Sequence, residues 1–494
     1  AYEIPKRDWS SDVCSSDLVH HRDFVLDRDG GGPEAGPRPV RLDRFVVAES
    51  PQMEGAAIAL QEQRFAPNLR TVVTADEFGA ASEGDIGEFL KFLPGVTMGY
   101  TGGDARQVSL GGLDHNYTPV TFAGFGMTNG NQGATNRGVA LEYVSLNNVS
   151  RVEIINSPTP ESPGGALAGS VNFVPRTAFE RVRPLYTLSS YFTFRDDARD
   201  FRRTPGPREN PSRKVLPGFE FSAVVPVSRR LGFTFSGAAS TSFSDWDALV
   251  NTWRGGNAVT NGSTFPDTTP DRPYLSSYLF RDGFLIRKRA SASLTVDAQL
   301  GPSDRVAFSL TSSAYNTNYD MRGLTFALAA VAPGFSTSSV RSTPGQGSLA
   351  VSTDVRDRNS LTWMPTLVLR HDGPVWRAEA GLGYSRSRDS IQSGDRGWFS
   401  NVTTGRSGLT LDFDDVTRER PGRIAALDNA TGRPVDPFAI ESYAVRTATF
   451  AVPQSTDTKR SAYGNAQRSL TWLGQPVQLK AGFDLDRKST RLNS

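Results

Sequence analysis

Histidine and cysteine are the side chains here best suited to bind a metal or act as a nucleophile. The chain has one cysteine and four histidines: His20 and His21 are adjacent, whereas His115 and His371 lie far away. A zinc site needs three or four ligands within reach, and no further cysteine or carboxylate cluster accompanies the pair. No Ser/His/Asp or Cys/His set occurs at a recognisable spacing. We therefore predict neither a metal site nor a catalytic residue, and the chain is not expected to be an enzyme.

Two glycine pairs could in principle form phosphate-binding loops. Gly111-Gly112 and Gly164-Gly165 are followed neither by a helix at the nucleotide-binding spacing nor by a Gly-Lys-Ser/Thr element. Glycines at such places are typical of tight turns in a packed sheet domain. We interpret both pairs as turns and predict no cofactor.

Composition excludes several classes of protein. The 494 residues carry 54 basic and 52 acidic side chains, so the near-zero net charge of +2 gives no reason to expect nucleic acid as a partner. Mean hydropathy is −0.38, and no run of about 18 apolar residues that could form a transmembrane helix occurs. The strands of a membrane barrel remain possible, because they alternate apolar with polar residues and give a weak hydropathy signal.

The two ends of the chain read differently from the rest. Residues 1–18, which include Cys14, and residues 487–494 look like translated sequencing adapter, and we set both aside as artefacts. Residues 19–48 are polar and rich in Gly and Pro, which is typical of a linker.

The most informative stretch is Arg151–Pro175. It contains two short apolar runs, Val152–Ile155 and Val171–Val174, joined by a segment rich in Pro, Ser and Gly, and so predicts a strand, an irregular crossing and a second strand. This pattern resembles the end of the plug domain of TonB-dependent outer-membrane receptors. The family's usual Arg-Gly-Pro is Asn156-Ser157-Pro158 in this chain.

Two further elements follow the order of that plug domain. Asp85–Val96 predicts an amphipathic helix stopped by Pro94-Gly95, and its end resembles the plug's Leu-Pro-Gly-Val element. The runs at 108–113 and 120–124 resemble the next two plug strands. A helix at 54–64 and a strand at 68–75 precede them. The resemblance therefore implies a plug domain over residues 49–180.

In this family the segment before the plug is the TonB box, which adds as a strand to the sheet of TonB. A β-prone segment occupies that place, and its alternating apolar side chains suit strand addition. An ordinary first strand of the plug is the alternative. The residues of the TonB-box candidate are Leu42, Asp43, Arg44, Phe45, Val46 and Val47. The implied partner is TonB with its inner-membrane energising complex.

From Leu185 the sequence changes to long segments with a period of two, as at 231–243 and 290–300. Short gaps alternate with long ones, which fits an outer-membrane barrel with short periplasmic turns and long external loops, such as 255–269 and 400–418. A soluble β-sandwich also alternates but has no reason to segregate its loops. The strands that we predict are 185–196, 217–227, 231–243, 288–300, 305–316, 359–370, 375–386, 461–472 and 477–485.

The predicted fold class is an α+β plug domain followed by an antiparallel transmembrane β-barrel over residues 181–486, truncated after about nine strands. Plugged barrels have about 22 strands, so nine cannot close. We expect a curved open sheet in which the strands at Leu185 and Val477 do not pair with each other. The expected location is the outer membrane of a Gram-negative-type envelope, in contact with its lipid.

The resemblance implies energised import of a scarce siderophore, cobalamin or oligosaccharide. A passive porin or adhesin, or a secreted β-rich polysaccharide-active enzyme, are the alternatives. Aromatic side chains among amides suit a sugar or a ferric chelate, although on loops they are as often structural. The ligand-binding candidates are Tyr100, Asp114, His115, Asn116, Tyr117, Asn129, Asn131 and Gln132 on plug loops, and Trp246, Trp253, Tyr274 and Trp398 on outer loops.

Overall fold

The computed structural model describes the chain from residue 55 onward, with gaps. The described ranges are 55–66, 68–74, 86–101, 104–128, 138–141, 149–159, 162, 164–205, 211–255, 265–393, 397–473 and 475–493. Residues 51–494 belong to one compact unit. Within the described ranges, no helix is both long and apolar enough to cross a membrane.

Two short α-helices lie in the N-terminal domain. Helix α1 (Gly55–Arg64) confirms the predicted helix, whereas α2 (Ile86–Leu90) is shorter than expected. The helix gives way to tight turns, in which the Leu93 amide donates to the Leu90 carbonyl, and Gly95 then reverses the chain with a φ of +76°. The predicted apolar face is nevertheless right, because Ile86, Phe89, Leu90 and Leu93 are all buried.

A five-stranded sheet forms the centre of this domain. Its strands are β1 (Arg70–Thr74), β4 (Val120–Phe122), β5 (Phe125–Gly126), β6 (Val149–Ile155) and β7 (Ser170–Pro175), in the order β1-β6-β7-β4-β5. Only β4 and β7 run parallel. The two apolar runs of the 151–175 stretch are therefore paired neighbours. A separate hairpin consists of β2 (Val96–Thr101) and β3 (Asp104–Leu110).

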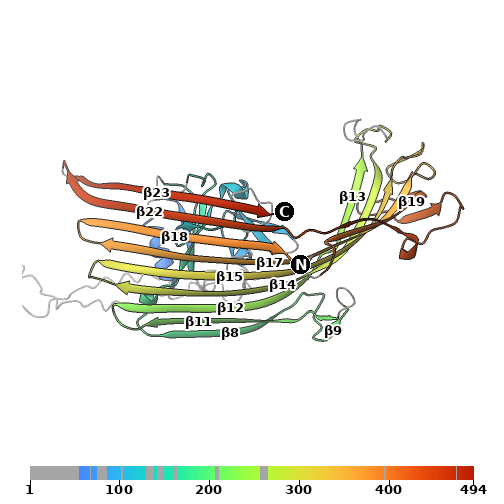
Figure 1. Ribbon diagram of the computed structural model, residues 1–494. Coiled ribbons are helices and arrows are strands. Elements are labelled where there is room, and N and C mark those ends of the chain that lie inside the picture. The colour runs from blue at the N-terminus through green and yellow to red at the C-terminus, as the bar shows by residue number, and fades with distance from the viewer. Residues whose placement is uncertain are drawn as a thin grey trace, which may run out of the picture. The chain divides into compact units, whose positions relative to one another are not determined.

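Apart from a two-stranded sheet of β9 (Arg203–Thr204) and β10 (Ser212–Arg213), the later strands form one large sheet, with every neighbouring pair antiparallel (Figure 1). Its main path contains β8 (Leu185–Thr193), β11 (Leu216–Pro226), β12 (Leu231–Asp245), β14 (Tyr274–Gln299), β15 (Asp304–Leu328), β17 (Gly347–Asp372), β18 (Trp376–Ile391), β22 (Gln454–Trp472) and β23 (Gln475–Asn493). These are the nine strands predicted from the sequence, in chain order across the sheet.

Several strands are much longer than predicted. Beyond the main path, β14, β15 and β17 continue into a smaller β region with β13 (Ala248–Arg254), β16 (Val340–Arg341), β19 (Asn401–Asp414), β20 (Arg423–Asp428) and β21 (Ala444–Thr449). The expectation of a loop at 400–418 is thus wrong, because β19 pairs with β17 and buries Leu409, Leu411 and Phe413 in a second apolar core. We call this the distal β region.

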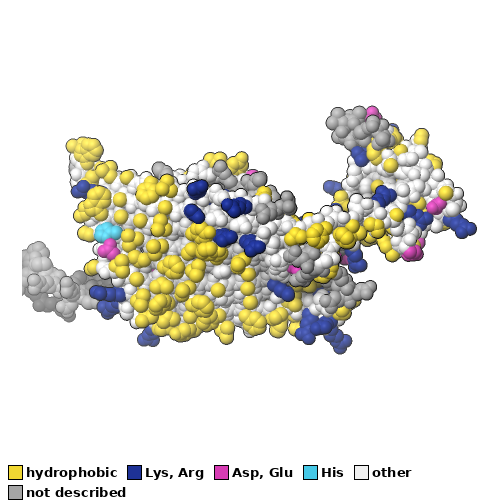
Figure 2. Space-filling view, viewed as in Figure 1, with side chains coloured by type: hydrophobic (Ala, Val, Ile, Leu, Met, Phe, Trp, Pro, Cys, Tyr) yellow, Lys and Arg dark blue, Asp and Glu magenta, His cyan; other side chains and the backbone are white. Residues whose placement is uncertain are grey.

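The two faces of the large sheet differ in chemistry. In β12, Gly232, Thr234 and Ser236 are buried on one face, while Phe235 on the other is 47% exposed. In β17, Thr362, Met364 and Thr366 are buried, whereas Leu361, Trp363 and Leu367 are exposed. Figure 2 shows the apolar face as a broad band of hydrophobic side chains over the long strands. The two-residue period therefore separates a polar face from an apolar one.

Strands β8 and β23 stand at the two ends of the main path, and among the described residues they do not pair with each other. We expected these strands, at Leu185 and Val477, not to pair. Residues 487–493, which read as adapter-like sequence, continue β23 in register with β22.

Candidate functional site

Asn172, in the middle of β7, joins three elements of the N-terminal domain. Its side-chain oxygen accepts hydrogen bonds from the Thr121 hydroxyl at 2.8 Å and the Gly124 amide at 3.0 Å. Its side-chain nitrogen donates to Glu153 at 3.0 Å. The turn between β4 and β5 needs this support because Ala123 and Gly124 both have positive φ values, 53° and 83°.

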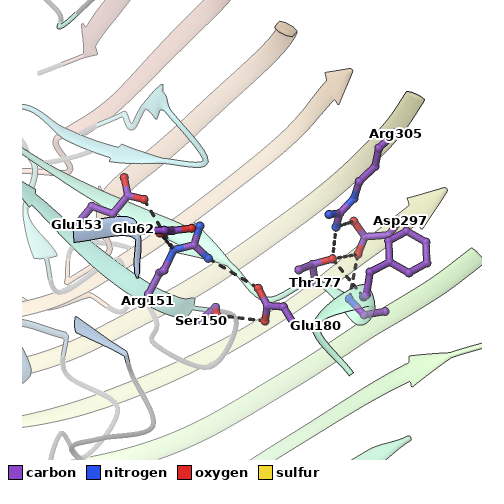
Figure 3. A network of polar contacts seen from close by, with 10 residues as sticks. Glu62, Ser150, Arg151, Glu153, Thr177, Glu180, Asp297 and Arg305 are labelled. Carbon is purple, nitrogen blue, oxygen red and sulfur yellow. Dashed lines mark hydrogen bonds and ion pairs between the residues drawn. The ribbon is translucent and has the colours of Figure 1, made fainter. Parts of the chain in front are cut away.

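Arg151, in β6, lies among three carboxylates (Figure 3). Its guanidinium is 2.5 Å from Glu62 of α1, 3.8 Å from Glu153 and 3.7 Å from Glu180. Burial raises the pKa of Glu62 and of Glu180, and Arg151 opposes both shifts by favouring the charged forms. This group of four, the Arg151 cluster, ties helix α1 and the end of the domain to the central sheet.

The chain leaves the domain through a short 3₁₀ helix, η6 (Ala178–Glu180), which is fixed to the large sheet. Buried Asp297 of β14 accepts hydrogen bonds from the Thr177 hydroxyl at 2.8 Å and the Ala178 amide at 3.0 Å. Arg305 of β15 pairs with Asp297 at 2.8 Å and also donates to the Thr177 hydroxyl (Figure 3). We call these four residues the exit latch.

Gly232 in β12 makes this arrangement possible. A Cβ atom at that position would lie 2.5 Å from the Cβ of Ala178, closer than two such atoms can approach. The guanidinium of Arg305 also lies 5.0 Å from the centre of the Phe179 ring, a cation–π distance. Three strands of the large sheet thus hold one turn of helix.

Other contacts join the domain to β17, β18 and β22. The Thr128 and Ser385 hydroxyls are 2.8 Å apart, and the rings of Phe125 and Tyr463 are 5.2 Å apart. Gly381 and Gly383 leave room for Phe125, since a Cβ at either would lie within 2.7 Å of the ring. Met364 and Val368 of β17 belong to the apolar core of the domain itself.

A cavity of about 1240 Å³ lies between the domain and the large sheet. Its lining mixes both signs of charge, with Arg70, Arg151, Arg176, Arg305, Arg370, Lys459 and Lys480 against Glu62, Glu153, Glu180, Asp297, Glu379, Asp484 and Asp486. Within the part of the chain that the structure describes, no group of three or more His, Cys, Asp or Glu side chains could hold a metal ion.

The N-terminal domain matches a known protein family. Residues 62–170 match the model of the TonB-dependent receptor plug domain. The N-terminal domain is a TonB-dependent receptor plug domain. The matched span contains Arg151 with its partners Glu62 and Glu153, and it ends two residues before Asn172. The N-terminal domain is therefore the plug, and the large sheet that follows it is the barrel sheet.

Structural comparison matches the chain to solved structures of receptors that are all distant in sequence. The ferric-catecholate import receptor Fiu from E. coli in its open form is 9% identical, with a TM-score of 0.36 over 86% of this chain and 66% of Fiu. The ferric enterobactin receptor PfeA of Pseudomonas aeruginosa is 13% identical, with a TM-score of 0.35 over 83% and 63%. The siderophore receptor PiuA of Acinetobacter baumannii is 10% identical, with a TM-score of 0.35 over 86% and 62%.

This chain spans less than two thirds of the length of each of these receptors. No curated protein matches it in sequence.

The structure places some of the ligand-binding candidates on the plug. Asp114 caps the 3₁₀ helix η3 (His115–Tyr117) by accepting from the Asn116 amide, and this hydrogen bond lowers the pKa of Asp114. Asn116 also accepts from the Gly138 amide at 3.3 Å. Tyr100 and Tyr117 are 51% and 45% exposed, so their rings are open to a ligand. The TonB-box candidate at 42–47, together with Asn129, Asn131 and Gln132, lies outside the described residues.

The four aromatic candidates on the barrel sheet have mainly packing contacts. Tyr274 is fully buried in the distal β region and its hydroxyl donates to the Pro266 carbonyl. Trp253 packs against the same core, and Trp246 lies 5.6 Å from the Tyr319 ring. Trp398 is half-buried. Since Tyr274 has no exposed surface in this conformation, it supports the distal β region rather than presenting itself to a ligand.

The sequence analysis did not identify the exit latch. Thr177 caps η6, whereas Asp297 and Arg305 lie in alternating strands, and only the fold brings the three together. One signal was available, since the acidic Asp297 follows Ser291, Ser293 and Thr295 on the inward positions of β14.

Proposed function

We propose that this chain provides the plug and part of the barrel wall of an outer-membrane importer energised by TonB. The single observation that carries the proposal is the plug-family match over 62–170, in a domain seated on the polar face of a sheet whose other face is apolar. The ligand is a small molecule of the siderophore, cobalamin or oligosaccharide class.

Exposure of the apolar face supports a location in lipid. Soluble monomers rarely expose large contiguous apolar patches, yet β11, β12, β15, β17 and β18 all contribute to this one. Its large exposed side chains include Phe219, Phe221, Phe235, Phe308, Leu310, Leu361, Trp363, Leu367, Leu369 and Leu382. From Leu369 to Leu361 the band of β17 covers about 26 Å of strand, or roughly 20 Å across a membrane once the strand is tilted.

In the proposed mechanism, ligand binds at the loops of the plug and of the barrel sheet, and TonB then pulls on the TonB box. The plug must yield without the barrel coming apart, because every barrel strand needs its neighbours in lipid. A separate domain that contacts the sheet through side chains meets that requirement, with polar contacts at the exit latch and the Thr128–Ser385 pair and apolar ones at Phe125 and Met364. The charged cavity between plug and sheet offers space for that rearrangement.

The experiment alters the TonB-box candidate in cells that express the receptor. Val46→Pro removes a backbone donor needed for strand addition, so energised uptake should be lost while ligand binding at the cell surface is retained. Val46→Thr keeps the donor and serves as the matched control, with uptake close to that of the unmodified receptor. Undiminished uptake by the Val46→Pro variant would rule out this segment as the TonB box. Uptake that persists in cells without TonB would instead indicate a passive pore.

A further inference from the structure

Arginines gather at one edge of the apolar face, on β18 and β22. Arg386, Arg388 and Arg460 are all exposed, and Figure 2 shows Lys and Arg side chains grouped there over β18, β22 and β23 beside the apolar band. The three named arginines all lie before residue 487, outside the stretch that resembles translated adapter. We call them the arginine patch.

Pairing between strands places the patch on the membrane-facing side. Arg386 is opposite Trp363 of β17, Arg388 is opposite Leu361, and Arg460 is opposite Tyr384 of β18. Trp363 is 36% and Leu361 51% exposed, and the Trp363 and Tyr384 rings are 5.0 Å apart. Arginines therefore directly adjoin the aromatic and aliphatic side chains at the end of the apolar band.

These arginines differ from those on the opposite face of the same sheet. There, Arg358 pairs with buried Asp389 at 2.5 Å, and Arg370 pairs with Glu379 at 2.6 Å. No carboxylate among the described residues lies within ion-pair distance of Arg386, Arg388 or Arg460. The side-chain oxygen of Gln454 accepts from the Arg388 guanidinium, but a neutral amide does not balance its charge. The positive charge of the three arginines is thus left for an anionic group outside the protein.

The position of the arginine patch along β18 and β22 indicates which membrane leaflet it faces. The patch lies on the halves of β18 and β22 away from the short turns at 373–375 and 473–474. If those turns face the periplasm, as the proposed function requires, the patch lies at the outer boundary of the membrane. Aromatic residues are enriched at that boundary, and arginine pairs with phosphate through two parallel hydrogen bonds.

Resting on the proposed function, we propose that Arg386, Arg388 and Arg460 bind the phosphate groups of a lipid in the outer leaflet. Side chains two residues apart on one face of a strand are about 6.6 Å apart, and adjacent strands are about 4.8 Å apart, so three guanidinium groups can reach the phosphates of one head group. The acyl chains of that lipid would lie along Leu361, Trp363 and Leu382 on the apolar face.

The test places the protein in vesicles of phosphatidylcholine that contain a trace of a fluorescent diphosphorylated glycolipid, such as lipid A, or the same glycolipid without phosphates. The unmodified protein should bind the phosphorylated form preferentially. Changing all three arginines to glutamine (Arg386→Gln, Arg388→Gln and Arg460→Gln) should weaken that binding at least tenfold, since basic side chains near the membrane surface attract anionic lipid.

The matched control removes three exposed arginines near the short turns instead, with Arg229→Gln, Arg230→Gln and Arg377→Gln. It should bind the lipid as the unmodified protein does. Equal loss in both triple variants, equal binding of the dephosphorylated lipid, or equally tight binding of inorganic phosphate alone would overturn the proposal.

Insertion into pure phosphatidylcholine vesicles, measured by protection from protease, distinguishes failure of the arginine patch from failure of the proposed membrane function. A protein that inserts but shows no preference for phosphate contradicts the arginine patch alone. A protein that inserts into none of the vesicles contradicts the proposed membrane function, and the patch with it.

Discussion

Single residues of the plug motif act by fixing one turn of backbone. Asn172 and Arg151 could be predicted as important from the sequence, because both belong to a short motif whose members lie close together in the chain. The partners of these two residues could not be predicted from the sequence. Glu62 is 89 residues from Arg151, and Gly124 is 48 residues from Asn172, so only the fold brings each pair together.

Asn172→Ala removes all three hydrogen bonds of the amide and should destabilise the plug by about 1–3 kcal/mol. The Gly124 amide donates its hydrogen bond to the Asn172 side-chain oxygen, so its hydrogen exchange should become much faster in this variant. Thr121→Val is the matched control, since it removes the hydroxyl partner and leaves the Gly124 hydrogen bond in place. Similar exchange at Gly124 in both variants would show that Asn172 does not hold the turn.

Glu62 and Glu180 of the Arg151 cluster should make the stability of the plug depend on pH. Their pKa values are raised in the folded state, so the stability they contribute is fully present below their unfolded pKa, about 4.3, and is lost as the pH rises through the raised values. Glu180→Gln should flatten this part of the profile of plug unfolding, measured by hydrogen exchange between about pH 4 and 7. A steeper profile in that variant would mean that Arg151 outweighs burial.

At the scale of elements, the sequence predicts which strands exist better than where they end. Alternation within β12 and β14 is visible in the sequence because one face contacts the polar interior and the other is apolar. The sequence predicts β14, β15 and β17 too short and a loop where β19 lies. A loop and a strand of the distal β region have the same mixture of polar and apolar residues, and only the second apolar core distinguishes them.

A single substitution in β12 can test whether the exit latch holds η6 on the barrel sheet. Gly232→Ala should displace η6, because its Cβ would meet Ala178, and exchange at the amides of η6 should rise while exchange in β14 and β15 stays slow. Gly237→Ala on the same strand meets its nearest neighbour, the Ser291 carbonyl, at an ordinary 3.5 Å and should leave η6 protected. Equal protection of η6 in the two variants would contradict the latch.

For the whole molecule, the order of strands and the plug could be derived from the sequence, because short turns alternate with long connections. The contacts between the plug and the barrel sheet could not be derived from the sequence. They depend on side chains such as Phe125, Thr128 and Asp297, whose partners are distant in the chain. We propose that the apolar face spans the outer membrane, with the short turns on the periplasmic side and the distal β region outside.

Labelling of single cysteines in intact cells tests that claim most directly. With Cys14→Ser as background, Glu419→Cys beside the distal β region and Arg229→Cys at the β11–β12 turn place one thiol at each exposed end. A maleimide that cannot cross the outer membrane should label Glu419→Cys in intact cells and Arg229→Cys only after the membrane is permeabilised. Labelling of Arg229→Cys in intact cells, with Glu419→Cys protected, would contradict the account.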